Sequence, residues 1–110
     1  ETILSEKIET ILHRGKYNAR MKDYYDIYFF LTKLKNEINL DIFKQALNNT
    51  LVKREAIDYY KDYKQILEGL VDDDRINNYW NTYKKKNKYA GNIDFKEIIK
   101  VLSEFLDNIN

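Results

Sequence analysis

The absence of proline constrains this chain more than any other feature of its sequence. The 110 residues contain no proline and only three glycines, Gly15, Gly69 and Gly91. Proline interrupts helices and glycine weakens them, so long stretches of this chain are free to be helical. Apolar residues recur at helical spacing, and no segment alternates apolar and polar residues as a strand would. The sequence therefore predicts an all-α fold.

We expect one domain over residues 1–110, built as a helical bundle of five to six helices. The first helix covers residues 2–14, with Gly15 as its stop signal and Asn18 as the N-cap of the next helix. The second helix, residues 20–35, is apolar around most of its circumference. A helix of that kind is usually buried, so we expect the second helix at the centre of the bundle.

The later helices are placed by apolar stripes and capping signals. A stripe at residues 40–51 predicts the third helix, and apolar spacing from Tyr59 to Leu70 predicts the fourth, although the segment Val52–Asp62 is ambiguous. Asp72 or Asp73 is suited to cap the fifth helix. The last helix is the best defined, because a capping box begins at Asp94 in front of a long apolar stripe.

Composition excludes several classes of function. The 19 basic and 18 acidic side chains leave a net charge of +1, so any nucleic-acid binding must come from local clustering. Without cysteine there are no disulfides, thiolate metal sites or cysteine nucleophiles, and His13 as the only histidine argues against a histidine metal site. No apolar run reaches the roughly 18 residues of a membrane span. We expect a cytoplasmic protein with no membrane partner. A chain that opens on Glu1 in a helical pattern is expected to be part of a longer protein.

Two groups of charged residues deserve a chemical interpretation. Lys7 falls inside the apolar arc of the first helix, and Asp23 and Asp26 lie one turn apart on the second. The short loop between the helices predicts an antiparallel hairpin, which brings both acids within range of Lys7. The sequence does not decide which acid pairs with it. A lysine beside carboxylates is consistent with phosphate binding, and equally with a structural ion pair.

Other polar clusters have simpler explanations. A basic stretch near the end of the fifth helix is interpreted as a solvated C-terminal turn rather than an RNA-binding patch; it comprises Lys84, Lys85, Lys86 and Lys88. Most of the ten tyrosines fall on apolar stripes and are interpreted as core residues. Asp72, Asp73 and Asp74 are interpreted as a helix cap.

The first third of the chain carries a recognisable pair of motifs. Residues 4–7, Arg14 and residues 20–27 follow the pattern L-x-E-K…R…R-x-K-D-x-Y-D-I. This pattern resembles the AbiEii/AbiGii family of bacterial nucleotidyltransferase toxins, found in abortive-infection and type IV toxin–antitoxin systems. The resemblance covers about the first 30 residues. Thr10 departs from it, because a small residue is expected there.

The resemblance implies the C-terminal helical portion of an enzyme that transfers a nucleotide from an NTP to an acceptor such as tRNA. In that family the N-terminal half carries a Gly-Ser element and a D-x-D carboxylate pair that holds Mg²⁺. This chain has no D-x-D apart from residues 72–74, so the fragment alone is expected to be inactive and to contain no metal site. The implied partners are the missing half, the NTP, tRNA and a cognate antitoxin.

Site residues follow from the resemblance by position. Lys7 is expected to contact the NTP phosphates, and Asp23 or Asp26 to act as base or orienting acid. The candidate catalytic residues are therefore Lys7, Asp23 and Asp26, and the candidate substrate-binding residues are Lys7, Arg14, Arg20 and Lys22. The alternative is a non-catalytic helical module that binds a protein partner, in which these charges form ordinary salt bridges.

Overall fold

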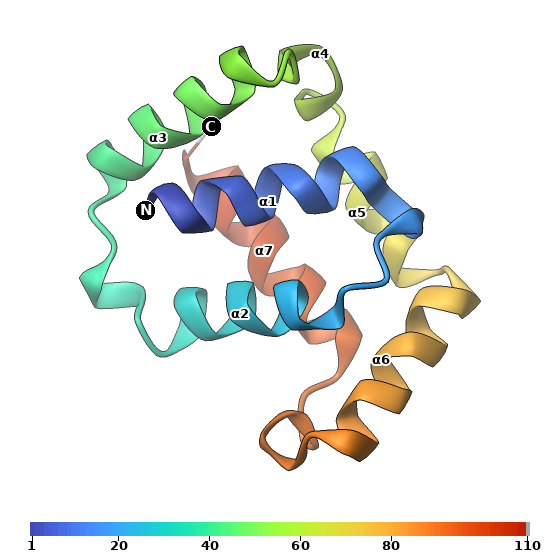
Figure 1. Ribbon diagram of the computed structural model, residues 1–110. Helices are drawn as coiled ribbons and strands as arrows, with labels where there is room; N and C mark the ends of the chain where they lie inside the picture. Colours follow the sequence, from blue (N-terminus) through green and yellow to red (C-terminus); the bar gives the residue numbers. More distant parts are fainter. Residues whose placement is uncertain (110) are drawn as a thin grey trace.

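The computed structural model describes residues 1–109, which form helices and short connections without a strand (Figure 1). Seven α-helices and three short 3-10 helices follow one another: α1 (Thr2–Arg14), η1 (Gly15–Tyr17), α2 (Met21–Thr32), η2 (Lys35–Glu37), α3 (Leu40–Lys53), α4 (Ile57–Tyr60), α5 (Tyr63–Val71), α6 (Asp74–Lys86), η3 (Lys88–Ala90) and α7 (Phe95–Ile109). The all-α prediction is confirmed, with a helix count within residues 1–109 slightly above the expected five to six.

The extra helix arises because the predicted helix over residues 59–70 is divided. α4 ends at Tyr60 and α5 begins at Tyr63. The hydroxyl of Tyr59 donates to Glu9 on α1, whereas that of Tyr63 donates to Asp107 on α7. Two tyrosines that would share one face of a continuous helix are thus held by different helices, and the chain turns between them.

The first helix ends where the sequence predicts. Gly15 follows Arg14 with φ 52° and ψ −132°, and its N–H donates to the carbonyl of Ile11. A residue with a Cβ rarely adopts that backbone conformation, so glycine stops the helix here. The N-cap expectation for Asn18 is wrong, because α2 begins only at Met21. The Asn18 side chain instead accepts a hydrogen bond from the Arg20 N–H (3.2 Å) in the loop.

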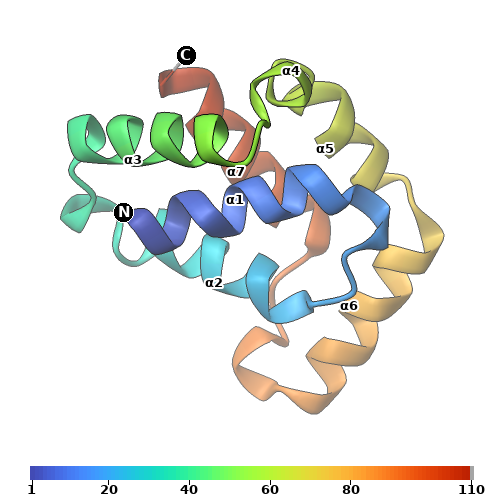
Figure 2. The same cartoon turned by 45° about the horizontal axis from the view of Figure 1, so that its top comes forward.

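Two helices share the centre of the bundle. α2 packs on α1, α6 and α7 and buries Tyr24 and Ile27, which confirms its place in the core. One face of α2 nevertheless reaches solvent, where Phe29 is 39% exposed. α1 lies beside α2 on one side and against α3, α4 and α5 on the others (Figure 2). The side chains of α1 therefore meet two different surroundings.

Beyond α5 the chain runs outward along α6 and then returns to the core as α7 (Figure 1). The Asp73 side chain accepts from the Ile76 N–H (2.9 Å) and caps α6, as predicted. Trp80 is buried, and its indole N–H donates to the carbonyl of Ile93 (2.8 Å), which ties α6 to the segment before α7. α7 then passes across the bundle with Leu102 and Leu106 fully buried. Within residues 1–109, no helix combines the length and apolar character that a membrane crossing requires.

Candidate functional site

Lys7 on α1 contacts both acidic residues of α2. Its Nζ lies 3.2 Å from Asp23 Oδ1 and 3.2 Å from Asp26 Oδ2. The sequence left open which of the two acids would pair with Lys7, and the structure shows that both do. The side chains of Lys7, Asp23 and Asp26 are 22%, 5% and 17% exposed, respectively. The group is therefore mostly buried, and its one opening to solvent lies at Lys7 and Asp26.

Helix geometry explains this arrangement. α1 and α2 lie side by side and are joined by η1 and a short loop (Figures 1 and 2). Residues three apart on a helix share a face, so Asp23 and Asp26 project in the same direction from α2. Lys7 lies in the middle of α1 among core residues, and its long side chain reaches between the two carboxylates. An unpaired ammonium would be costly at that depth, and two acids remove the cost.

Two further cations lie at the edge of the site. Lys22 Nζ lies 2.9 Å from Asp26 Oδ2, and Arg20 Nε lies 3.8 Å from Asp23 Oδ2. Both of these basic side chains are largely exposed. We call Lys7, Arg20, Lys22, Asp23 and Asp26 the charge cluster. With three cations and two carboxylates, it carries a net positive charge; Lys7 lies between the acids, and Arg20 and Lys22 lie on their exposed side.

The electrostatic surroundings keep Lys7 in its charged form. Partial burial lowers the pKa of Lys7, but the hydrogen bonds and negative charges of Asp23 and Asp26 outweigh it and raise the pKa above its ordinary value. Lys7 therefore remains protonated throughout the physiological range. This environment suits a lysine that binds an anion and does not suit one that accepts a proton.

Arg14 lies outside the charge cluster. It is the last residue of α1, is exposed, and makes no ion pair within residues 1–109. Its guanidinium is available to a ligand at the turn between α1 and α2. Of the six candidate site residues, the structure thus brings five together and leaves Arg14 at the margin.

A divalent cation does not fit the charge cluster. Mg²⁺ is bound by several oxygen ligands, and the two carboxylates here already contact Lys7, Arg20 and Lys22. Moreover, residues 1–109 contain no group of three or more histidine, aspartate or glutamate side chains that could hold a metal ion. The cluster is suited to a phosphate instead, because its uncompensated charge is positive.

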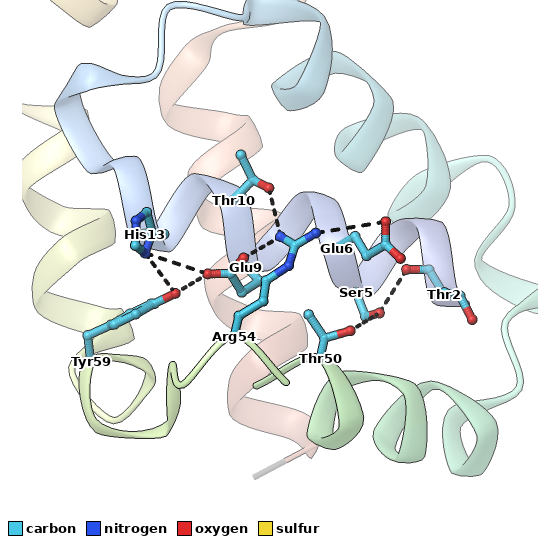
Figure 3. Close-up of polar contacts among 9 residues, drawn as sticks. All are labelled: Thr2, Ser5, Glu6, Glu9, Thr10, His13, Thr50, Arg54 and Tyr59. Carbon is cyan, nitrogen blue, oxygen red and sulfur yellow. Dashed lines mark hydrogen bonds and ion pairs between the residues drawn. The ribbon is translucent and has the colours of Figure 1, made fainter. Parts of the chain in front are cut away.

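A second buried acid escaped the sequence analysis. Glu9 is only 3% exposed and points toward Arg54, at the end of α3, and Tyr59 on α4 (Figure 3). It accepts hydrogen bonds from Arg54 and from the Tyr59 hydroxyl, and His13 lies 3.8 Å away. The signal that identified Lys7, a charge within the apolar arc of α1, does not apply to Glu9, which lies about 60° beyond Leu12 at the edge of that arc. Its partners are more than 40 residues away in sequence, and no local pattern points to them.

Thr10 has a specific role in this second group. Its hydroxyl accepts a hydrogen bond from Arg54 Nη1 (3.3 Å) (Figure 3). The same guanidinium bonds to Glu9 and lies 4.0 Å from Glu6. The departure from a small residue at position 10 therefore leaves the packing between α1 and α3 intact and adds a polar contact to it.

Comparison with known proteins identifies the family. The model of a protein family described as nucleotidyl transferase AbiEii toxin, type IV toxin–antitoxin system, matches residues 1–101. The chain belongs to the AbiEii family. The AbiEii match reaches into α7, far beyond the first 30 or so residues that carry the motif, so the helical tail is part of the family pattern. No curated protein and no solved structure matches this AbiEii chain.

Proposed function

We propose that this chain is the C-terminal helical half of an AbiEii nucleotidyltransferase toxin, which transfers a nucleotide from an NTP to an acceptor such as tRNA in the bacterial cytoplasm. One observation carries the proposal. Lys7 is a permanently charged lysine held between two carboxylates, with Arg20 and Lys22 exposed beside it. The family to which the chain belongs is one of nucleotidyl transferase toxins, whose substrate is a polyphosphate.

In this proposal Lys7 binds the phosphates of the NTP. Nucleotidyl transfer depends on positioning the polyphosphate and neutralising its charge. Asp23 and Asp26 hold the ammonium of Lys7 in place before the substrate arrives, so binding requires little reorganisation. Arg20 and Lys22, together with Arg14 at the turn, supply further positive charge along the same edge. Lys7 is thus a catalytic residue of the proposal, and the exposed cations are substrate-binding residues.

The two acids have different roles in the proposal. Asp23 is almost fully buried between Lys7 and Arg20, so we assign it to positioning Lys7. Asp26 is more exposed, and it is the acid that an acceptor hydroxyl can approach. We therefore assign to Asp26 the contact with the attacking group. As the acceptor oxygen bonds to the α-phosphorus and the bond to the pyrophosphate leaving group breaks, Asp26 accepts the proton that the hydroxyl releases.

The proposal assigns Mg²⁺ to the other half of the protein. Mg²⁺ supplies charge neutralisation of the phosphates in such transfers. The charge cluster does not fit this ion, so its ligands are expected among the D-x-D carboxylates that the family resemblance implies. The chain described here would be inactive without that half. Its contribution is the cationic face against which the nucleotide is held.

A transfer assay with the protein that carries this chain tests the proposal. Radiolabelled NTPs are offered with bulk tRNA, and label on the RNA is measured for the native protein and for Lys7→Ala. Loss of one preorganised charge typically lowers turnover by about 100-fold or more, and we expect that loss for Lys7→Ala. The matched control is Lys33→Ala, an exposed lysine just beyond α2. Native-like transfer by a folded Lys7→Ala protein would contradict the proposal.

The alternative is a non-catalytic module that binds a protein partner such as a cognate antitoxin. It has one structural argument, an apolar groove of about 550 Å³ between α3, α4 and α5 that is lined in part by Leu47, Leu51, Ile57 and Tyr60. This alternative predicts no label on RNA from the native protein with any of the four NTPs. The same assay therefore separates the two functions.

A further inference from the structure

A row of aromatic rings extends from the charge cluster along the outside of the molecule. Tyr25 lies 6.2 Å from Phe29 and 4.6 Å from Tyr89, centroid to centroid, and Tyr89 lies 6.1 Å from Tyr83. Tyr79 precedes Tyr83 by one helical turn and shares its face of α6. We call these five residues the aromatic ladder. The positions of most tyrosines on apolar stripes predicted core residues, yet this group runs along the surface.

Several rings of the ladder are open to solvent. Tyr89 is 55% exposed, and Phe29 and Tyr79 are each exposed to about 40%. The ladder is nevertheless held firmly from beneath. Tyr83 stacks on the buried ring of Trp80 at 5.4 Å, and the hydroxyls of Tyr83 and Tyr89 are hydrogen-bonded. Tyr83 and Tyr89 are therefore fixed in place, and the ladder offers exposed apolar rings to a ligand.

Three of the five ladder residues, Tyr79, Tyr83 and Tyr89, belong to the most basic part of the chain. Residues 75–96, which we call the basic arm, contain six basic side chains and one acidic one. The rest of the chain has 13 basic and 17 acidic side chains, so the positive charge of the molecule is concentrated on this arm. Lys85, Lys86 and Lys88 are exposed; Lys86 shares the face of α6 that carries Tyr83, and Lys88 immediately precedes Tyr89. Figures 1 and 2 show α6 and the connection to α7 as an arm at one end of the molecule.

The ladder and the charge cluster are neighbours. α2 carries Tyr25 and Asp26 as consecutive residues and packs on α6. Burial is the main cause that raises the pKa of Tyr83, and the hydrogen bond to Tyr89 and the charge of Asp26 add to it. Asp26 is itself paired with Lys7 and Lys22, so its negative charge does not repel an anionic ligand on the ladder. The ladder residue Tyr25 therefore adjoins Asp26, a partner of Lys7, on the helix that packs against the basic arm.

We infer that the aromatic ladder and the lysines of the basic arm bind a single-stranded polynucleotide, with bases stacked on Tyr89, Tyr79 and Phe29 and phosphates on Lys86 and Lys88. Exposed aromatic rings beside a row of cations are the combination that such strands require. Base pairs in a duplex hide the faces that would stack, so an unpaired segment is selected. The inference deepens the proposed function, because this strand is the acceptor and the ladder delivers its end to Asp26.

Binding is measured by fluorescence anisotropy in the absence of NTP, with the protein that carries this chain. The probes are labelled oligonucleotides of about 10 nucleotides, a length within the usual range of single-strand sites, as RNA, as DNA and as the corresponding duplexes. We expect single-stranded RNA to bind, with or without binding of single-stranded DNA. Each duplex should bind at least about fivefold more weakly than the single-stranded RNA. Equal affinity for duplex and single strand would overturn the inference, as would no binding at all, which would leave the ladder to a protein partner.

Substitutions separate stacking from charge. Tyr89→Ala is expected to weaken single-strand binding at least about fivefold, whereas Tyr89→Phe, which keeps the ring, retains it. Tyr17→Ala is the matched control, because Tyr17 is 74% exposed beside Lys16 but lies outside the ladder. Equal losses for Tyr89→Ala and Tyr17→Ala, with both proteins folded, would show that no stacking site exists at the ladder.

The lysines are tested by salt dependence. Lys86→Ala with Lys88→Ala is expected to lower the slope of log affinity against log salt by about 1.4, or ~0.7 for each lost phosphate contact. The control pair is Lys44→Ala with Lys61→Ala, two exposed lysines beside the groove between α3 and α5. An unchanged slope in the first pair contradicts phosphate contacts on the basic arm. Because Lys7→Ala should retain strand binding and lose transfer, failure of this inference is distinguishable from failure of the proposed function.

Discussion

The ammonium of Lys7 and the carboxylate of Asp23 lie 3.2 Å apart although 16 residues separate them in the sequence. The contact spans two antiparallel helices, and Asp26 completes it from the next turn of α2. A lysine held in this way cannot turn into solvent without leaving a buried carboxylate unpaired. The hairpin of α1 and α2 therefore presents a positive charge at a defined position, and several consequences can be measured.

Asp23 should matter more than Asp26 for stability, whereas Asp26 should matter more than Asp23 for transfer activity. Asp23→Asn leaves the buried side of the cluster short of one charge and should lower the free energy of unfolding by about 1 kcal/mol. Asp26→Asn keeps the Lys7–Asp23 pair and should cost less than about 0.5 kcal/mol, because its other partner, Lys22, is a surface lysine. Transfer activity should fall more for Asp26→Asn. Urea unfolding measures which variant loses more stability, and the transfer assay measures which loses more activity. The opposite ranking in either measurement contradicts the assigned roles.

The Gly15 turn should be sensitive to a single methyl group. A Cβ at position 15 meets no atom within 4 Å, but φ is +52°, so Gly15→Ala strains only the backbone. We expect a loss of about 2 kcal/mol of unfolding free energy. Gly69→Ala is the matched control, since Gly69 lies inside α5 with equal space around it and no positive φ. That control should gain about 0.5 to 1 kcal/mol, because alanine favours helix. Equal effects at both positions would show that backbone strain at Gly15 is unimportant.

Stability should fall in alkaline solution. Burial raises the pKa of Tyr24, and the charge of Asp23 adds to the effect, while the pKa of Lys7 is raised by its two acids. The folded state thus keeps protons that the unfolded chain releases above about pH 10, and the free energy of unfolding decreases as pH rises through that range. Thermal melts between about pH 8 and 11 measure the decline. A melting temperature that stays constant or rises there contradicts the prediction.

Tyr24→Phe should flatten the alkaline decline without harming the protein at neutral pH. The Tyr24 hydroxyl is buried, and within residues 1–109 it has no partner that meets hydrogen-bond geometry; its contact with Asn18 falls short. Removing a buried polar group without a partner is neutral or stabilising. Tyr17→Phe, at an exposed position, is the control and should leave the decline unchanged. A clear loss of stability at pH 7 in Tyr24→Phe would mean that the hydroxyl is hydrogen-bonded.

The Glu9 carboxylate should couple strongly to Arg54. Arg54→Ala leaves a buried carboxylate with Tyr59 and His13 as its neighbours, and we expect a loss of about 2 kcal/mol. The value is below that for a fully buried pair because Arg54 is 41% exposed. Once Glu9→Gln has removed the charge, Arg54→Ala should cost much less. A double-mutant cycle by urea unfolding measures this coupling, with exposed Lys53→Ala as control. Additive losses would contradict it.

Local patterns predicted the parts of this fold that depend on local physics. The bounds of α1 and the start of α7 follow from apolar spacing, from Gly15 and from Asp94, and all three signals act within one or two helical turns. The pairing of Lys7 with α2 could also be predicted, because two helices joined by a short loop pack against each other as an antiparallel hairpin.

Local patterns could not predict the break between α4 and α5, the partners of Glu9 or the aromatic ladder. Each of these features depends on contacts between helices that are distant in sequence. Tyr59 reaches Glu9 across 50 residues, and Tyr25 meets Tyr89 across a longer interval. A tyrosine on an apolar stripe has the same pattern whether it is buried like Tyr24 or exposed like Tyr89. Only the neighbours that cover it make the difference.

The sequence by itself thus determined that the chain is helical, where its first and last helices begin, and that a lysine and two acids would meet across the first hairpin. The tertiary structure alone decided that both acids bind Lys7, that Glu9 pairs with Arg54, and that a row of tyrosines remains at the surface. Helical periodicity depends on neighbours a few residues away. Burial and pairing between distant helices depend instead on the packing of the whole bundle, which local spacing does not contain.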